Sequence, residues 1–269
     1  MPIQPRLRRC SSVTCRRACS LVAPSSRGRL GRGPEVTNLG DADQGYCGDA
    51  FFPTQILSQV IDMIDAQLLC PEGHSSADCI ASIVRTISES LKNYGANPKP
   101  NFSIIHAMRI GIKMQSRFEV HKVDFSHGNR GNPHFIKIPQ DSGVLASIVS
   151  GQTAFDASMS KWRRSDVQAT SRAVFSAFCD ALRDGIDPLS GPPPQLVGLY
   201  RIGGGRAFGV VWNRHRYFYG TEVAGDMSSR NIKWHNDLFE LCDPATLERE
   251  TGSQPQPRPW PPKLEPKTS

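Results

Sequence analysis

The sequence predicts an α+β domain in which N-terminal helices precede a C-terminal antiparallel β-meander. In two segments, 54–69 and 77–94, apolar residues recur every three or four positions, which is typical of helices with one buried face. Segment 195–223 instead alternates β-prone runs with glycine-rich or polar turns, which indicates hairpin-linked strands. Because the helices come first and the strands cluster late, the order favours α+β over an alternating α/β sheet.

The two early helices carry recognisable end signals. The first is predicted from Thr54 to Leu69, directly after Pro53, a residue suited to a helix start. The second is predicted from Ala77 to Tyr94, with Ser76 as its N-cap and Gly95 as its stop.

The middle of the chain is expected to contain strands and two more helices. Segments 118–125 and 134–138 are β-prone, whereas 102–117 fits either a helix or a strand. Helices are expected over 144–150 and 167–183, each followed by a glycine.

The meander is the strongest β signal in the chain. Strands are predicted over 195–202, 207–212 and 217–223, and a further element over 232–242. Its glycine-rich turn leads from strand to strand, so it lacks the helix start that a phosphate-binding loop needs.

Composition divides the chain into three parts. Residues 1–43 are expected to be a disordered basic leader, 44–250 a single globular α+β domain, and 251–269 a proline-rich disordered tail. The tail contains a bare PxxP motif within Pro259–Pro262, which we interpret as linker composition.

The net charge of +7 comes from the leader. Residues 1–35 contain eight arginines and one acid, Glu35, so the rest of the chain is formally neutral. Since a domain that grips phosphates normally carries its own basic excess, the folded part is not expected to bind nucleic acid. No stretch approaches the ~20 apolar residues of a transmembrane helix, so no membrane span is expected.

The leader itself has three interpretations. Its arginines and serines, with almost no acid, are typical of an organellar transit peptide and also of a bacterial export leader. A tail without function fits the same composition.

The cysteines and histidines give no metal or cofactor signature. The eight cysteines form no Cys-x-x-Cys pair and are expected to be reduced thiols. His121, His127 and His134 lie close in sequence, but we interpret them as surface or turn residues, since a metal site needs three or four converging ligands. No cofactor and no metal are therefore expected.

Cys79 is the candidate nucleophile. It lies in the first turn of the second predicted helix, where the positive end of the helix dipole stabilises a thiolate. A thiol protease would then need a histidine on a later strand as its base. The alternative is that Cys79 is a small buried residue.

The meander adds a family resemblance. Leu196–Trp212 followed by Tyr217–Gly220 resembles the C-terminal half of YopT/AvrPphB-type cysteine proteases, which are papain-like effectors injected into host cells. The catalytic positions of that family are not matched. Arg206 stands where the catalytic histidine would be, and Tyr219 and Gly220 stand where an Asp-Pro pair would be.

Two shorter segments also resemble cysteine hydrolases. Gln44–Phe52 looks like the region of papain around its nucleophile. In that alignment Ala50 replaces the catalytic cysteine, and Gln44 keeps the role of an oxyanion-hole residue. Cys47, in the same segment, is a second candidate thiol. Asp78-Cys79 at a helix start is similar to cell-wall amidases of the NlpC type.

The resemblance implies a host-targeted bacterial effector with a degenerate cysteine-protease-like fold, secreted into the host cell and acting on a host protein. If the chain is an enzyme, we expect a thiol protease with Cys79 as nucleophile and His121, His134 or His235 as base. An arginine stays protonated at neutral pH and cannot replace that base, which favours an inactive form. The alternative is a non-catalytic interaction protein with an organelle-targeting leader, in the cytoplasm or in mitochondria.

Overall fold

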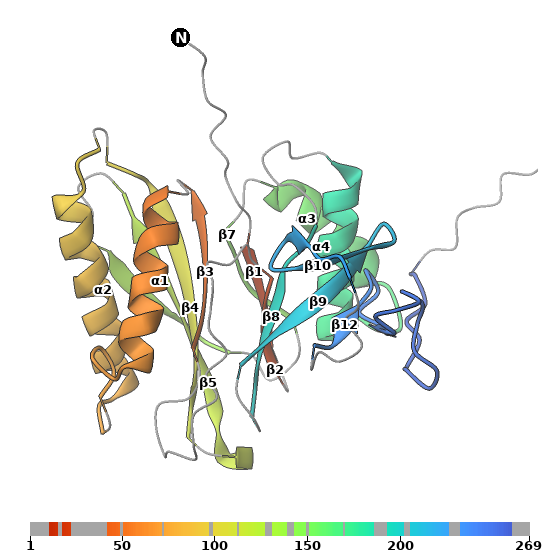
Figure 1. The fold of residues 1–269 in the computed structure, drawn as a ribbon, viewed down its shortest axis with the longest axis horizontal. Coiled ribbons are helices and arrows are strands. Elements are labelled where there is room, and N and C mark those ends of the chain that lie inside the picture. Colours follow the sequence, from red (N-terminus) through yellow and green to blue (C-terminus); the bar gives the residue numbers. More distant parts are fainter. Residues whose placement is uncertain are drawn as a thin grey trace, which may run out of the picture.

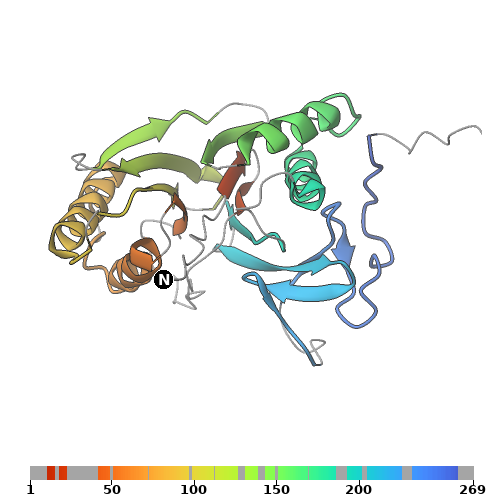
Figure 2. The same ribbon diagram turned by 90° about the horizontal axis from the view of Figure 1, so that it is seen from above.

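A computed structural model shows an α+β chain arranged in four layers (Figure 1, Figure 2). Two helices cover a small sheet, a larger sheet follows, and two further helices cover the larger sheet. The residues that the structure describes are 11–15, 18–22, 42–48, 51–71, 73–96, 99–111, 113–126, 131–138, 143–148, 151–168, 170–185, 193–201, 205–225 and 232–259. None of the helices in this part of the chain combines the length and apolar character that a membrane crossing requires.

The helices occupy the two outer layers. α1 and α2 pack on the small sheet, and α3 and α4 pack on the large sheet (Figure 1). Their bounds are Phe51–Asp65 for α1, Ser76–Asn93 for α2, Gln152–Trp162 for α3 and Ser171–Asp184 for α4.

The small sheet is antiparallel, with the order β3-β4-β5-β6. The large sheet has nine strands, in the order β11-β10-β9-β8-β2-β1-β7, with β12 and β13 attached through β9. The strands of the small sheet are β3 Ala42–Gly48, β4 Phe102–Ile110, β5 Arg117–Phe125 and β6 Asn132–Ile136. Those of the large sheet are β1 Ser11–Cys15, β2 Ala18–Val22, β7 Gly143–Ile148, β8 Leu196–Tyr200, β9 Arg206–Trp212, β10 His215–Phe218, β11 Thr221–Glu222, β12 Trp234–His235 and β13 Leu241–Cys242.

The core consists of three apolar layers between these four. Ile104 of β4 belongs to the cluster under α1 and α2, whereas its neighbour Ile105 belongs to the cluster between the two sheets. Leu199 of β8 lies in the same inter-sheet cluster, and Phe208 of β9 lies under α3 and α4. Successive side chains of a strand point to opposite faces, so each central strand supplies two layers.

This double burial explains why segment 102–117 was ambiguous. A strand buried on both faces is an apolar run without alternation, which resembles a buried helix. The structure has β4 to Ile110 and a single 3-10 turn at Lys113–Gln115 before β5.

The start of α2 is fixed by a capping box. The Ser75 hydroxyl accepts a hydrogen bond from the backbone N–H of Asp78, and the Asp78 carboxylate accepts one from the backbone N–H of Ser75. The N-cap is therefore Ser75 and not Ser76. The helix ends at Asn93, one residue before the predicted end at Tyr94, which is the C-cap.

The predicted helix at 144–150 is wrong, because residues 144–148 belong to strand β7, Gly143–Ile148. Its β-branched residues pair with β1, a neighbour that local sequence cannot reveal. The helix in this region is α3 instead. Trp162 is fully buried at the end of α3 and donates a hydrogen bond from Nε1 to Asp180 at 2.8 Å.

Both ends of the chain contain more structure than the sequence indicates. β1 and β2 lie within the segment expected to be a disordered leader, and they join the middle of the large sheet. Residues 251–259, the first half of the expected disordered tail, pack along α4. The PxxP motif extends outside the described residues from position 260.

The meander is confirmed, and one of its glycines is required by packing. Gly209 of β9 pairs with Trp234 of β12, and a Cβ at this position would lie 2.2 Å from Cε3 of the buried Trp234 ring. The Gly209→Ala variant is expected to lose about 2 kcal/mol of unfolding free energy, because the strand or the ring must shift. Urea denaturation measures the loss.

The matched control is Gly95→Ala, where an added Cβ meets nothing within 4 Å. It is expected to change the unfolding free energy by less than about 0.5 kcal/mol. Equal stability of the two variants would contradict the packing of Trp234 against β9.

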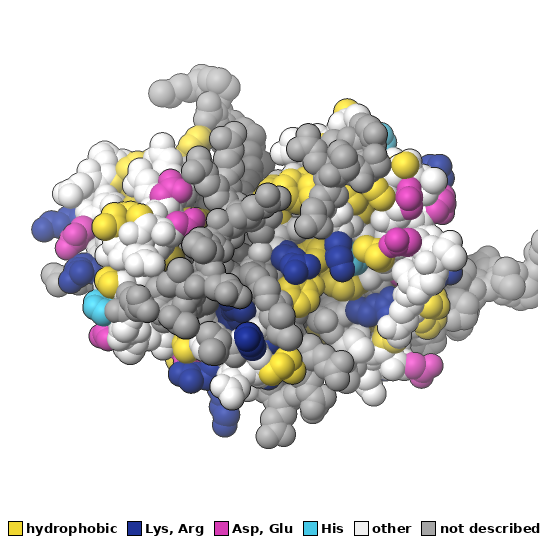
Figure 3. Space-filling model, turned by 60° about the horizontal axis from the view of Figure 1, so that its bottom comes forward, with side chains coloured by type: hydrophobic (Ala, Val, Ile, Leu, Met, Phe, Trp, Pro, Cys, Tyr) yellow, Lys and Arg dark blue, Asp and Glu magenta, His cyan; other side chains and the backbone are white. Residues whose placement is uncertain are grey.

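Charge is unevenly spread over the surface. On the face shown in Figure 3, Lys and Arg side chains gather in the middle, whereas Asp and Glu side chains lie toward the sides.

Candidate functional site

Cys79 lies in the first turn of α2, as expected, but its side chain is completely buried, with an exposed fraction of 0%. Burial raises the pKa of the Cys79 thiol, and the nearby Asp78 carboxylate raises it further. A hydrogen bond with the Cys70 thiol opposes this shift without reversing it. The sulfur is therefore a protonated thiol at neutral pH and not the activated thiolate that a nucleophile needs.

His121 lies on β5 and is buried. It pairs across the sheet with His106 of β4, and its ring packs edge-on against Phe135 of β6 at 5.5 Å between centroids. Burial lowers the pKa of His121, while Glu119, 3.8 Å away, acts in the opposite direction. The imidazole is therefore neutral at pH 7.

His106 completes this histidine pair and was not identified from the sequence. It is almost fully buried, and burial, assisted by His121, lowers its pKa to about 3. Its Nδ1 lies 3.1 Å from Nε2 of Gln44 on β3. Gln44, which the papain-like register assigned to an oxyanion hole, is thus a hydrogen-bond partner of a buried histidine.

The histidine pair and Gln44 contain buried polar atoms that have no hydrogen-bond partner. Within the described part of the chain, Gln44 Oε1, His106 Nε2 and His121 Nε2 are buried without a hydrogen bond. No spacing pattern in the sequence marks this pair, because Gln44, His106 and His121 come together only through the pairing of β3, β4 and β5. Cys47 lies on β3 opposite Ser103, and its side chain is outside the described residues.

His235 belongs to the other side of the molecule. It lies on β12, where its ring contacts Phe208 and Phe239 at centroid distances of 5.2 and 4.6 Å. Burial lowers its pKa to about 4, with Lys233 as the next contributor. Because α2 and β12 lie at opposite ends of the fold, His235 does not meet Cys79 (Figure 1).

The residues aligned with the catalytic positions of the effector proteases, and the last candidate histidine, do not supply a base near Cys79 either. Arg206 is exposed at the start of β9, with its guanidinium 5.7 Å from the Tyr200 ring centroid. Tyr219 and Gly220 form the tight turn between β10 and β11, both with positive φ. His134, the third histidine considered as a base, is exposed on strand β6.

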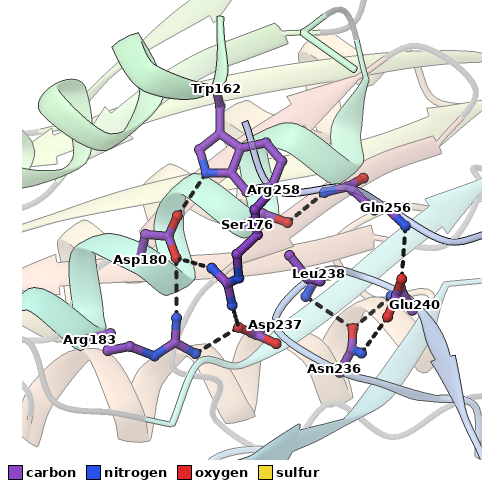
Figure 4. A network of polar contacts seen from close by, with 10 residues as sticks. All are labelled: Trp162, Ser176, Asp180, Arg183, Asn236, Asp237, Leu238, Glu240, Gln256 and Arg258. Atoms are coloured by element: carbon purple, nitrogen blue, oxygen red, sulfur yellow. Dashed lines mark hydrogen bonds and ion pairs between the residues drawn. The ribbon is translucent and has the colours of Figure 1, made fainter. Parts of the chain in front are cut away.

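The densest polar site is a network that holds the C-terminal segment against α4 (Figure 4). We call it the C-terminal latch. Its inner half centres on Gln256, which is buried. The Gln256 backbone N–H donates to Glu240 Oε1 at 2.8 Å, and its Nε2 donates to Ser176 Oγ at 2.7 Å.

The outer half of the latch is ionic. Arg258 donates to Asp180 at 3.1 Å and to Asp237 at 2.5 Å, and Arg183 bridges the same two carboxylates at 3.2 and 2.7 Å. Burial alone would lower the pKa of Arg258, but Asp237 and Asp180 outweigh it and raise the pKa. Each carboxylate is neutralised by two guanidinium groups, which suits a structural clamp and leaves no free general base.

The described residues contain no cluster of three or more His, Cys, Asp and Glu side chains arranged to bind a metal ion. No known family model matches the chain, and comparison with curated proteins found no match either.

Proposed function

We propose that this chain is a non-catalytic interaction protein: a host-directed effector that acts by binding a host protein and does not cleave it. The observation that carries the proposal is the complete burial of Cys79. Its protonated thiol makes a hydrogen bond with the Cys70 thiol and not with an imidazole. The resemblance to the effector proteases then concerns the descent of the sequence, and the chemistry has been lost.

The distribution of histidines supports the same conclusion. A thiol protease needs its nucleophile and base within hydrogen-bond reach. Among the candidates, His235 is at the opposite end of the molecule, and His121 is directed into a buried pair with His106. Arg206 stands at the family's histidine position, and a guanidinium side chain cannot serve as a general base.

A thiol-directed electrophile tests the proposal. An epoxide probe of the papain type is expected to leave Cys79 unlabelled in the native protein at pH 7, because the thiol is buried and protonated. After denaturation in urea the same cysteine is expected to react fully. Peptide mapping by mass spectrometry quantifies both states.

The control is the Cys79→Ser variant under identical conditions. Labelling of native Cys79, together with peptide cleavage that disappears in Cys79→Ser, would establish a working protease and contradict the proposal.

The alternative targeting role of the leader needs a separate test. Because β1 and β2 lie within residues 1–35, deleting this segment would also disturb the large sheet. Fusing residues 1–35 to a fluorescent protein isolates the targeting question. Import of the fusion into mitochondria would favour the organelle interpretation over the effector.

A further inference from the structure

Positive charge is also unevenly distributed along the sequence, because two segments contain lysines and arginines but no acidic residue. Residues 90–118 lie between Glu89 and Glu119 and include five lysines and arginines. Residues 188–221 contain four arginines and no Asp or Glu. The domain outside the leader is neutral as a whole, so these segments concentrate positive charge locally.

The fold brings the turns of these two segments together. The carbonyl of Arg201, after β8, accepts hydrogen bonds from Arg109 Nη1 and from Ser116 Oγ, both at 3.1 Å. In return, Arg201 Nη1 donates to the carbonyl of Met114 at 3.4 Å. The β4–β5 hairpin and the end of β8 therefore form one surface. We call it the basic tip and define it by Arg109, Lys113, Arg117, Arg201 and Arg206.

The basic tip has an apolar residue at its apex. Met114, in the 3-10 turn between β4 and β5, has 65% of its surface exposed. Lys113 and Gln115 beside it are also exposed, and the side chain of Arg117 is 69% exposed. Among the described residues, the pair of Arg117 with Glu119, at 3.3 Å, is the one salt bridge made by Lys113, Arg117, Arg201 and Arg206.

We propose that the basic tip docks onto a membrane surface that contains anionic phospholipids, with Met114 inserted at the level of the headgroups. Clustered lysines and arginines are attracted to the negative potential of such a leaflet. An exposed apolar side chain between cations adds the hydrophobic contact that interfacial binding requires. This docking does not depend on the protein partner proposed above.

A nucleic acid is the other polyanion that a basic surface could bind. Non-specific binding of single strands relies on exposed aromatic rings that stack on bases, and readout of duplexes uses a helix or strand that enters a groove. Among the described residues, Tyr200 is the aromatic ring in contact with a cation of the basic tip, and it is half-buried beneath Arg206. An exposed methionine at the apex fits a lipid interface better.

Vesicle co-sedimentation of the full chain tests the proposal. The protein is expected to bind vesicles of phosphatidylcholine with 30% phosphatidylserine, as a choice of probe, much more strongly than phosphatidylcholine alone. The Lys113→Gln/Arg206→Gln variant removes one exposed cation from each hairpin and should reduce partitioning roughly 30-fold, at about 1 kcal/mol for each charge. Met114→Ser should reduce it about fivefold, and Met114→Leu should preserve it.

The charge-matched control is Arg163→Gln/Arg164→Gln, which removes two exposed arginines after α3. It is expected to change partitioning less than about twofold, since these residues are not part of the basic tip. Absence of binding to phosphatidylserine vesicles would overturn the proposal, as would an equal effect of the control variant. Tighter binding to an RNA or DNA duplex that is lost in Lys113→Gln/Arg206→Gln would identify a nucleic-acid surface instead.

Discussion

Lowering the pH from 7 to 5 is expected to reduce the free energy of unfolding by about 4 kcal/mol. The cause is the burial of His106 and His235, whose pKa values in the folded state are about 3 and about 4. In the unfolded chain both imidazoles titrate near the ordinary value of about 6.5. Urea denaturation followed by tryptophan fluorescence at pH 7, 6 and 5 measures the change.

The direction follows from proton binding. Above pH 6.5 both histidines are neutral in the folded and the unfolded states, so they do not affect the pH dependence of stability. Below pH 6.5 these histidines bind protons in the unfolded chain but stay neutral in the folded chain. Acid therefore favours unfolding until the pH falls to the pKa of the histidines in the folded state. At pH 5 each residue contributes about 2 kcal/mol of this loss. His121, with its pKa lowered by burial, adds to the same trend.

Single variants separate the contributions. The loss of stability between pH 7 and 5 should fall to about 2 kcal/mol in His106→Gln and likewise in His235→Gln, whatever the stability of each variant at pH 7. A wild-type loss below about 1 kcal/mol would contradict the buried, neutral state of the two histidines.

Removing the C-terminal segment after Gly252 is expected to destabilise the domain by about 4 kcal/mol. The truncation deletes Gln256, so the buried Ser176 and Glu240 each lose a hydrogen bond, although Glu240 keeps the one from Asn236. Each lost buried hydrogen bond costs about 1–3 kcal/mol. The ion pairs of Arg258 add less than about 1 kcal/mol, because that side chain is substantially exposed. Thermal and urea unfolding provide the measurement.

A shorter truncation is the matched control. Ending the chain at Pro259 keeps every contact of the C-terminal latch and should change stability by less than about 0.5 kcal/mol. Within the latch, Gln256→Ala should cost more than Arg258→Ala, since only the first side chain is buried. If the truncation after Gly252 were as stable as the full chain, the C-terminal segment would not be part of the domain.

The sequence predicts the elements whose signals are local. The apolar stripe of α2, its end within one residue of Tyr94 and the hairpins of the meander depend on periodicity, capping and turn residues, all of which are readable along the chain. The α+β class follows from their order. The helix predicted at 144–150 failed because strand β7 depends on pairing with β1, a contact between residues more than a hundred positions apart.

The candidate site could be predicted only in part. The position of Cys79 at a helix start is a local property, but its burial depends on how α2 packs, and burial reverses the expected shift of its pKa. His106 was missed because a histidine within an apolar strand carries no spacing signal. Gln256 was missed because a proline-rich composition describes the average of a segment, whereas the latch uses two of its polar side chains.

The hairpin formed by β1 and β2 lies between β8 and the edge strand β7, so it connects β7 to the rest of the large sheet. During synthesis the hairpin emerges before β7 and β8, and its outer backbone groups find partners only when those strands follow. Proteolytic maturation that removed residues 1–22 would expose the facing edges of β7 and β8, each open to a strand from another protein. Cleavage of the N-terminal segment would therefore create two unpaired strand edges in the large sheet.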